Sequence, residues 1–433
     1  MPQTRAVSAR LARLRLASST TPGKLVAVGI GVLLGAVLFG LVAIAVVGDR
    51  RDAAHAVSSD SEPLLAHAVG LYASLSDADA TAATTFLTGG LEPLARRQRY
   101  TADLQAGARD AAALTASVRG SVAASESVVA VSENLPVYAG LVETARADNR
   151  AGLPVGAAYL REASALLQTA ILPDVGVLYA FAAGRLQAGY SSGTGGFGLI
   201  AVIAVAVAYL AVFVLAQRWL ASATRRRVND GLLAATGLLV LLSAWVLVAL
   251  VFQQNALGRA QHSGSDPVEA LSATRILASR AQSDQSLTLV ARGGDQQHPA
   301  DFDAVILALT GARGGLLALE ASVSHNGTSI KRLASDLNAY RAQSAALDAL
   351  VAQGEVERAV QEEIAAGAGG RSPADVLDAE LASRISAAQV SFSSAAEDAR
   401  TALSGLGPGI PLTVLAIAAL ALAGIGRRLR EYA

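Results

Sequence analysis

The centre of the chain constrains the fold most, because two long apolar runs lie there on either side of Arg225–Arg227. The runs cover residues 197–217 and 231–252, and an α-helix needs about 20 mostly apolar residues to cross the hydrocarbon core of a bilayer. The sequence therefore predicts two membrane helices joined by an arginine-rich turn, residues 218–230.

Two further apolar runs, residues 25–47 and 409–426, predict a first and a fourth membrane helix. Long, mostly polar segments separate the runs, residues 48–196 in the first half and 253–408 in the second. Each half thus repeats one plan: a membrane helix, a long polar segment and a second membrane helix. We expect a multi-pass protein of the cell membrane.

Charge predicts how the chain is oriented. The short segments, residues 1–24, 218–230 and 427–433, are rich in arginine, whereas the long segments hold most of the acidic residues. Basic residues beside membrane helices stay on the cytoplasmic side, so we expect both termini and the turn in the cytoplasm. Arg50 and Arg51, just after the first span, point the other way. A cleaved signal peptide is the alternative for the first span, but its apolar run exceeds the about 7–15 residues of a signal core.

Composition predicts helices for the long segments as well. The chain is 52% hydrophobic, 16% charged and only 4% aromatic, which suits membrane helices continued by long helices and not a β-barrel. It contains no cysteine, so disulfides, thiol nucleophiles and zinc–thiolate sites are excluded. The predicted fold class is all-α.

Apolar residues in the first long segment alternate spacings of four and three, which predicts helices with one buried seam. The first helix is expected to stop at Gly89–Gly90. Further helices are predicted to start at Glu92–Pro93, at Asn134–Pro136 and after Gly152–Pro154. A kink is expected at Pro173. The seam of the first helix consists of Leu64, Ala68, Leu71, Leu75, Ala78 and Ala82.

The second long segment repeats this pattern. Leu309 belongs to one predicted seam, between residues 302 and 323, and Leu337 belongs to another, between residues 330 and 351. Gly293–Gly294 follows the third span about as far as Gly89–Gly90 follows the first, and a last helix is expected to begin at Pro373. The sequence therefore predicts an internal duplication, with one four-helix bundle in each long segment.

Catalytic and metal sites are not expected. The cytoplasmic segments are too short for an enzyme domain, and the spans nearly lack the ionisable groups of transport paths. In the first span, Gly31-x-x-x-Gly35 and Ala36-x-x-x-Gly40 allow close helix contact. We expect no enzyme, no transporter, no cofactor and no metal. The histidines are scattered without a second histidine or a carboxylate at metal-ligand spacing: His55, His67, His262, His298 and His325.

Partner binding is expected at two exposed places. Helices of up to about 40 residues, rising 1.5 Å per residue, put the turns at Gly89–Gly90 and Asn149–Pro154 at one distal end; ordinary solvated turns are the alternative. Asp77 and Asp79 diverge on a helix, so we expect one of them to face solvent. The candidate partner-binding residues are Gly89, Gly90, Glu92, Arg96, Arg97, Asn149 and Arg150 at the distal end, and Arg225, Arg226 and Arg227 in the turn.

Three strings of the first long segment resemble the actinobacterial four-span family often called GlnX: residues 71–90 (LYASLSDADATAATTFLTGG), 135–152 (LPVYAGLVETARADNRAG) and 154–164 (PVGAAYLREAS). The second long segment matches in layout. The resemblance implies a relay in which a GlnH-type solute-binding lipoprotein senses extracellular amino acids such as aspartate or glutamate. The membrane protein then passes the state to a soluble Ser/Thr kinase, protein kinase G. The resemblance also implies outer domains similar to the four-helix sensor modules of chemoreceptors, and it carries over no binding residues.

Two functional classes stay open at this point. The first is a signal relay, with a direct small-molecule receptor as its variant, and the second is a non-switching structural scaffold of the cell envelope. The expected partners are the lipid bilayer, the lipoprotein outside and the kinase inside, with no nucleic acid, and a homo-oligomer stays open. An outer interaction that changes with amino-acid supply would separate the two classes.

Overall fold

The computed structural model describes residues 21–90, 92–224, 229–291, 304, 327–367 and 372–430, and the regular elements of this part of the chain are all helices. This confirms the predicted all-α class. The chain divides into two compact units. Unit 1 takes residues 1–55, 190–257 and 397–433, and unit 2 takes residues 56–189 and 258–396. Unit 2 therefore combines both long polar segments.

Unit 1 contains the apolar runs. Four helical stretches are long and apolar enough to cross a membrane, which confirms the four predicted spans as candidates: Val26–Phe86, Val155–Leu220, Asp230–Val290 and Pro373–Arg427. The helices that hold the apolar runs are α2 (Thr21–His55), α8 (Gly196–Thr224), α9 (Asp230–Ala260) and α16 (Leu406–Arg430).

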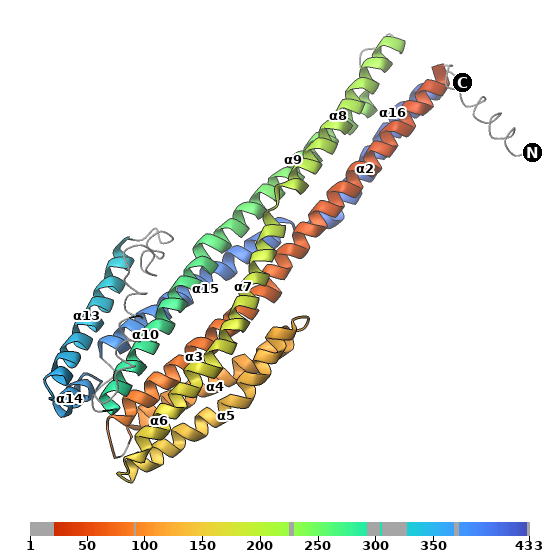
Figure 1. Cartoon of the computed structure of the whole chain (residues 1–433). Coiled ribbons are helices and arrows are strands. Elements are labelled where there is room, and N and C mark those ends of the chain that lie inside the picture. Colours follow the sequence, from red (N-terminus) through yellow and green to blue (C-terminus); the bar gives the residue numbers. More distant parts are fainter. Residues whose placement is uncertain are drawn as a thin grey trace, which may run out of the picture. The chain divides into compact units, whose positions relative to one another are not determined.

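Close packing in unit 1 depends on small residues of α2. This helix packs against α8 and lies beside α16 (Figure 1). A Cβ atom added at Gly35 would collide with the Tyr209 ring, and one at Gly40 would lie 3.3 Å from Val414. Tyr209 donates a hydrogen bond to the Val32 carbonyl at 2.9 Å. The predicted close contact is thus present at Gly35 and Gly40, whereas Gly31 meets open space.

Arg50, near the end of α2, is held by hydrogen bonds to residues around the end of α7 and to α9. Its guanidinium donates to the carbonyls of Gly193 and Gly195, and at 3.4 Å to Gln253 Oε1. These carbonyls lie at the C-terminal end of α7 (Leu172–Thr194), where a cation balances the helix dipole. Arg50 is 3% exposed. Its positive charge on this side of the first span is therefore explained by helix capping.

Unit 2 contains helices from both long segments. The first segment contributes α3 (Glu62–Phe86), α4 (Leu94–Ser117), α5 (Val122–Arg150), α6 (Val155–Leu166) and most of α7. The second contributes α10 (Asp266–Val290), α13 (Gly327–Ala352), α14 (Val356–Gly367) and most of α15 (Pro373–Ala402). All six predicted seam residues of α3 are buried. In α13 Leu337 is 1% exposed, as predicted, whereas Leu309 and Gly293–Gly294 lie outside the described residues.

The predicted helix start at Asn134–Pro136 is wrong. Helix α5 begins at Val122 and contains Pro136 in its interior. Gly120, with a φ of 97°, turns the chain, and the Ser121 hydroxyl caps the helix by accepting from the Ala124 amide at 3.2 Å. Asn134 bonds back to the Ala130 carbonyl at 2.9 Å and caps nothing. The glycine and serine therefore define this helix start.

Among the described residues, three π-helical segments interrupt the helices, and a proline follows each. They are η1 (Ala56–Ser61), η2 (Leu167–Ile171) and η3 (Gln261–Ser265), followed by Pro63, Pro173 and Pro267. Proline lacks an amide hydrogen and crowds the carbonyl four residues earlier, so the preceding turn widens. The predicted irregularity at Pro173 is therefore present as a π-helical turn.

Candidate functional site

The two long segments meet along α3 and α10, and this contact is polar. Every side chain of α3 from Leu75 to Thr85 is buried, as is every side chain of α10 from Ser283 to Leu289. A helix buried on all sides is usually apolar all round, yet here Asp, Ser, Thr and Gln fill the interior. Buried polar groups need hydrogen-bond partners, so the two helices must satisfy one another.

The contacting residues of α3 and α10 keep a nearly constant register. Asp77 meets Ser279, Asp79 meets Ser283, and Thr84 meets Ser286, at sequence separations of 202, 204 and 202 residues. Because both members of each pair advance together along the chain, the two helices run parallel. The same stretch of each helix, counted from its own start, therefore faces the other.

Asp79 is an enclosed carboxylate at the centre of this contact, 3% exposed. It accepts hydrogen bonds from Ser283 at 2.6 Å, from Ser164 at 2.7 Å and from Tyr138 at 3.3 Å. Burial raises its pKa, and the serine hydrogen bonds offset part of that shift. One carboxylate thus ties α3 to α5, α6 and α10.

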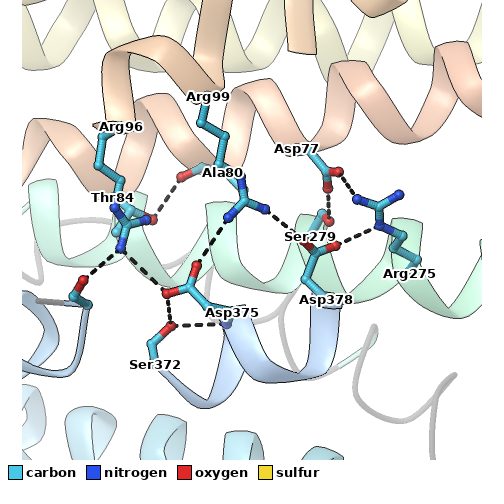
Figure 2. A network of polar contacts seen from close by, with 11 residues as sticks. Asp77, Ala80, Thr84, Arg96, Arg99, Arg275, Ser279, Ser372, Asp375 and Asp378 are labelled. Carbon is cyan, nitrogen blue, oxygen red and sulfur yellow. Dashed lines mark hydrogen bonds and ion pairs between the residues drawn. The ribbon is translucent and has the colours of Figure 1, made fainter. Parts of the chain in front are cut away.

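Asp77 begins a chain of alternating charges that Figure 2 shows in full. Arg275 of α10 donates to Asp77 at 2.7 Å and to Asp378 of α15 at 2.6 Å. Arg99 of α4 donates to Asp378 at 2.7 Å and to Asp375 at 3.3 Å. Two arginines therefore bridge three carboxylates, and the chain joins α3, α4, α10 and α15.

The chain of charges ends at the start of α15. Arg96 of α4 pairs with Asp375 at 3.6 Å and donates to the Gly367 carbonyl at 3.2 Å. The Ser372 hydroxyl donates to Asp375 at 2.7 Å and accepts from the Asp375 amide at 3.1 Å, which caps α15 (Figure 2). The first turn of a helix from the second segment is thereby fixed to α4 of the first.

Asp103 of α4 is an additional acid beside this network. Burial, followed by the charge of Asp77, raises its pKa to about 7. Its Oδ2 atom is buried and makes no hydrogen bond to the residues that the structure describes. Burial also raises the pKa of Asp77, against the opposing effect of Arg275. The Asp103 carboxylate can therefore take up a proton near neutral pH.

The predicted distal turns do come together. Asn149 donates to the Phe86 carbonyl at 2.9 Å, so the end of α5 lies beside the end of α3. Gly89 and Gly90 adopt φ values of 60° and 56°, which favour glycine. Glu92 pairs with Arg146 at 3.1 Å, and that guanidinium lies 4.0 Å from the centre of the Tyr100 ring. One hollow is lined by Gly89, Gly90, Glu92, Arg146, Asn149 and Arg150, together with three neighbouring residues of α3 and its C-terminal turn.

The other candidate partner-binding residues lie elsewhere. Arg96 belongs to the internal network described above, so its side chain is occupied. Arg97 pairs with Glu143 at 3.5 Å, and both side chains are nearly half exposed. Arg225, Arg226 and Arg227 lie outside the described residues.

The expectation that Asp77 or Asp79 faces solvent is wrong. A helix with one buried face would expose one of the two side chains, but α3 is covered on all sides here, so both are buried. A run of small and polar residues without lysine, arginine or glutamate, residues 76–85, was the available signal. The expectation that no histidine has a carboxylate at ligand spacing is wrong for His262, which lies 3.1 Å from Asp266, four residues later. His67 lies 2.9 Å from Asp110 of α4, a contact between two helices.

Comparison with known proteins bears on the first half. Residues 53–191 match the family model described as the actinobacterial sensor domain. Comparisons with curated proteins and with solved structures find no match. The matched residues begin in the last turn of α2 and end within α7. The chain therefore carries a stretch similar to an actinobacterial sensor domain, placed between its first two apolar runs, residues 25–47 and 197–217.

Proposed function

We propose that the chain is a transmembrane signal relay without catalytic activity of its own. The observation that carries the proposal is the sensor-domain match over residues 53–191, which lies between the apolar runs of two helical stretches long enough to cross a membrane. A sensor between two spans has its output on the other side of the bilayer. Residues 1–24, 218–230 and 427–433 are too few to fold into an output domain. The signal therefore passes to a separate cytoplasmic protein.

The proposed partners follow from the resemblance to the GlnX family. Outside, a GlnH-type solute-binding lipoprotein reports aspartate or glutamate to unit 2. Inside, the basic segments, including Arg225–Arg227, contact a protein kinase G-type Ser/Thr kinase. The hollow that contains Glu92, Asn149 and Arg150 is the proposed contact for the lipoprotein. These turns expose polar groups, as weak signalling contacts do.

The proposed topology places both termini and residues 218–230 in the cytoplasm and both long segments outside. The excess of arginine in the short segments supports it, and the capping role of Arg50 accounts for one of the two arginines that pointed the other way. Reporter fusions at Ser125 and Gln343 should be active only with a reporter that works after export. Activity of a cytoplasmic reporter at either site would contradict this topology.

We also propose that the two halves arose by duplication. Both η1 and η3 end in a Ser-x-Ser-acid-Pro string, at Ser59–Pro63 and Ser263–Pro267. The spacing between these strings is 204 residues, the same as that between Asp79 and Ser283. Each half then contributes one four-helix module to unit 2. The two modules contact each other within unit 2. Binding of a ligand or partner can change how they pack, and this change is the proposed signal.

The experiment compares native membranes with and without added aspartate and glutamate. The tagged full-length chain is crosslinked, and co-purified lipoprotein and kinase are quantified. The relay predicts that recovery of at least one partner changes with amino-acid supply, and that Glu92→Ala with Asn149→Ala and Arg150→Ala reduces lipoprotein recovery. Thr101→Ala, an exposed change on α4, is the matched control. Equal recovery in all conditions would favour a non-switching scaffold.

A further inference from the structure

A cavity of about 670 Å³ lies within unit 2 between α3, α7 and α10. Its volume falls in the range of sites for small molecules, about 300–1,000 Å³. The residues of α10 that line it recur every three or four positions, so they form one face of the helix. The lining residues that matter below are Tyr72, Gly176, Tyr179, Asp266, Glu269 and Ser272.

The polar groups of this cavity carry negative charge. Asp266 and Glu269 lie three residues apart on α10, and the residues that line the cavity include neither lysine nor arginine. Glu269 is exposed and hydrogen-bonded to Tyr179, whose pKa is raised by burial and by this contact. Asp266 pairs with the exposed His262 at 3.1 Å. An anionic ligand would find no counter-charge among the lining residues.

Two tyrosines complete the chemistry. Tyr72 of α3 and Tyr179 of α7 present aromatic rings, and the remaining walls are mainly aliphatic. An aromatic ring attracts a cation that lies within about 6 Å of its centroid. A nearby carboxylate neutralises the charge of the same cation. Ser272 is 2% exposed, and its hydroxyl makes no hydrogen bond to the described residues. This hydroxyl lies below the accessible surface of the cavity, so the carboxylates and the tyrosine side chains are the polar groups that a ligand can contact.

From these observations we infer that the cavity binds a small organic ammonium ion with an apolar body. The ammonium group lies between Glu269, Asp266 and the tyrosine rings, and the apolar body fills the aliphatic part. The free amino acids aspartate and glutamate do not fit this chemistry, because their carboxylates would face Asp266 and Glu269. Those amino acids are then sensed by a separate protein. Unit 2 would then respond to two kinds of signal: an organic cation that binds the cavity directly, and the anionic amino acids sensed through the separate protein.

Gly176 provides a clean way to fill the cavity. A Cβ atom added there meets nothing within 4 Å. Because Gly176 lines the cavity, a larger side chain at this position is expected to extend into it. Gly176→Leu should block binding, whereas Gly176→Ala, which adds only a methyl group at the wall, is the matched control. Glu269→Gln removes one charge at an exposed position and leaves the size of the side chain unchanged.

The experiment titrates the full-length protein in phosphatidylcholine nanodiscs by calorimetry. The probes are 2-phenylethylammonium and 3-phenylpropionate, which share a body and differ in the sign of the head group. We expect the ammonium to bind at least about tenfold more tightly than the carboxylate (about 1.4 kcal/mol for each factor of ten). Glu269→Gln should weaken ammonium binding severalfold, Gly176→Leu should abolish it, and Gly176→Ala should preserve it.

Three results would overturn the inference. They are no saturable binding of the ammonium, equal binding of the two probes, and ammonium binding that Glu269→Gln and Gly176→Leu leave unchanged. Thermal melting of each variant shows whether it is folded, and the exposed Glu269→Gln keeps the test decisive if Gly176→Leu unfolds the protein. The assay contains neither lipoprotein nor kinase, so its outcome is independent of the proposed relay.

Discussion

Removing the Ser283 hydroxyl tests whether Asp79 organises the contact between α3 and α10. Ser283→Ala deletes a donor 2.6 Å from a carboxylate that is 3% exposed, and it creates almost no cavity. A hydrogen bond to a charged group contributes about 1.5–3 kcal/mol, and a buried acceptor that loses its donor costs a similar amount. For a unit of this size, 1 kcal/mol corresponds to roughly 2–4 °C. We therefore expect the melting temperature to fall by about 3–12 °C.

The pH dependence gives this prediction a sign. The Ser283 hydrogen bond lowers the pKa of Asp79, so its loss raises that pKa further. A carboxylate whose pKa is raised in the folded state stabilises the protein less as the pH rises through that value. The destabilisation by Ser283→Ala should therefore be larger above the pKa of Asp79 than below it, because the neutral acid needs the donor less. Melts at pH 5 and pH 8 test the direction of this trend.

The assay is thermal unfolding of the detergent-solubilised full chain, followed by circular dichroism at both pH values. Ser391→Ala is the matched control, because Ser391 is exposed and bonds only to its own helix at the Ala387 carbonyl. The control should shift the melting temperature by less than about 1 °C. A Ser283→Ala shift as small as that of the control, or a larger shift at pH 5 than at pH 8, would refute the role assigned to Asp79.

Three further predictions concern unit 2. Asp103→Asn should flatten the dependence of melting temperature on pH between about 4 and 7, because the raised pKa of Asp103 makes stability fall as the pH rises through this window; an unchanged slope in a pH series of melts would contradict it. Leu337→Ala should destabilise the protein by about 2–5 kcal/mol in denaturant titration, since Leu337 is 1% exposed in the core, and an unchanged midpoint would place it at the surface. Arg275→Gln leaves Asp77 without its guanidinium partner, so limited proteolysis should cut the variant faster than Arg280→Gln, whose pair with Asp284 spans 3.8 Å; equal rates would count against the network.

The sequence predicted the elements well where one physical rule dominates. Four apolar runs predict four spans, and the three-four spacing of Leu64, Leu71 and Leu75 predicts a buried seam. It failed at Pro136, because a proline can sit inside a helix whose start is already fixed by Ser121. Each rule works locally, within a single helix and its ends.

The candidate site could not be predicted in the same way, because it depends on which helices meet. Asp79 has donors from residues 59, 85 and 204 positions away in the chain. A spacing rule for one helix cannot indicate that a second helix covers its opposite face. In the sequence of α10, this contact is indicated by three serines spaced by four and three residues, at positions 279, 283 and 286. They become informative only when paired with residues 77–84.

The register of α3 against α10 has a consequence for how such a contact can evolve. When two copies of one chain pair in parallel, residues near the axis meet their own copies, and Asp79 would meet a second Asp79. Here Ser283 stands opposite, so an acceptor on one helix meets a donor on the other. Because both helices belong to one polypeptide, the contact forms by an intramolecular step. Dilution cannot separate it, and the two faces are free to diverge residue by residue.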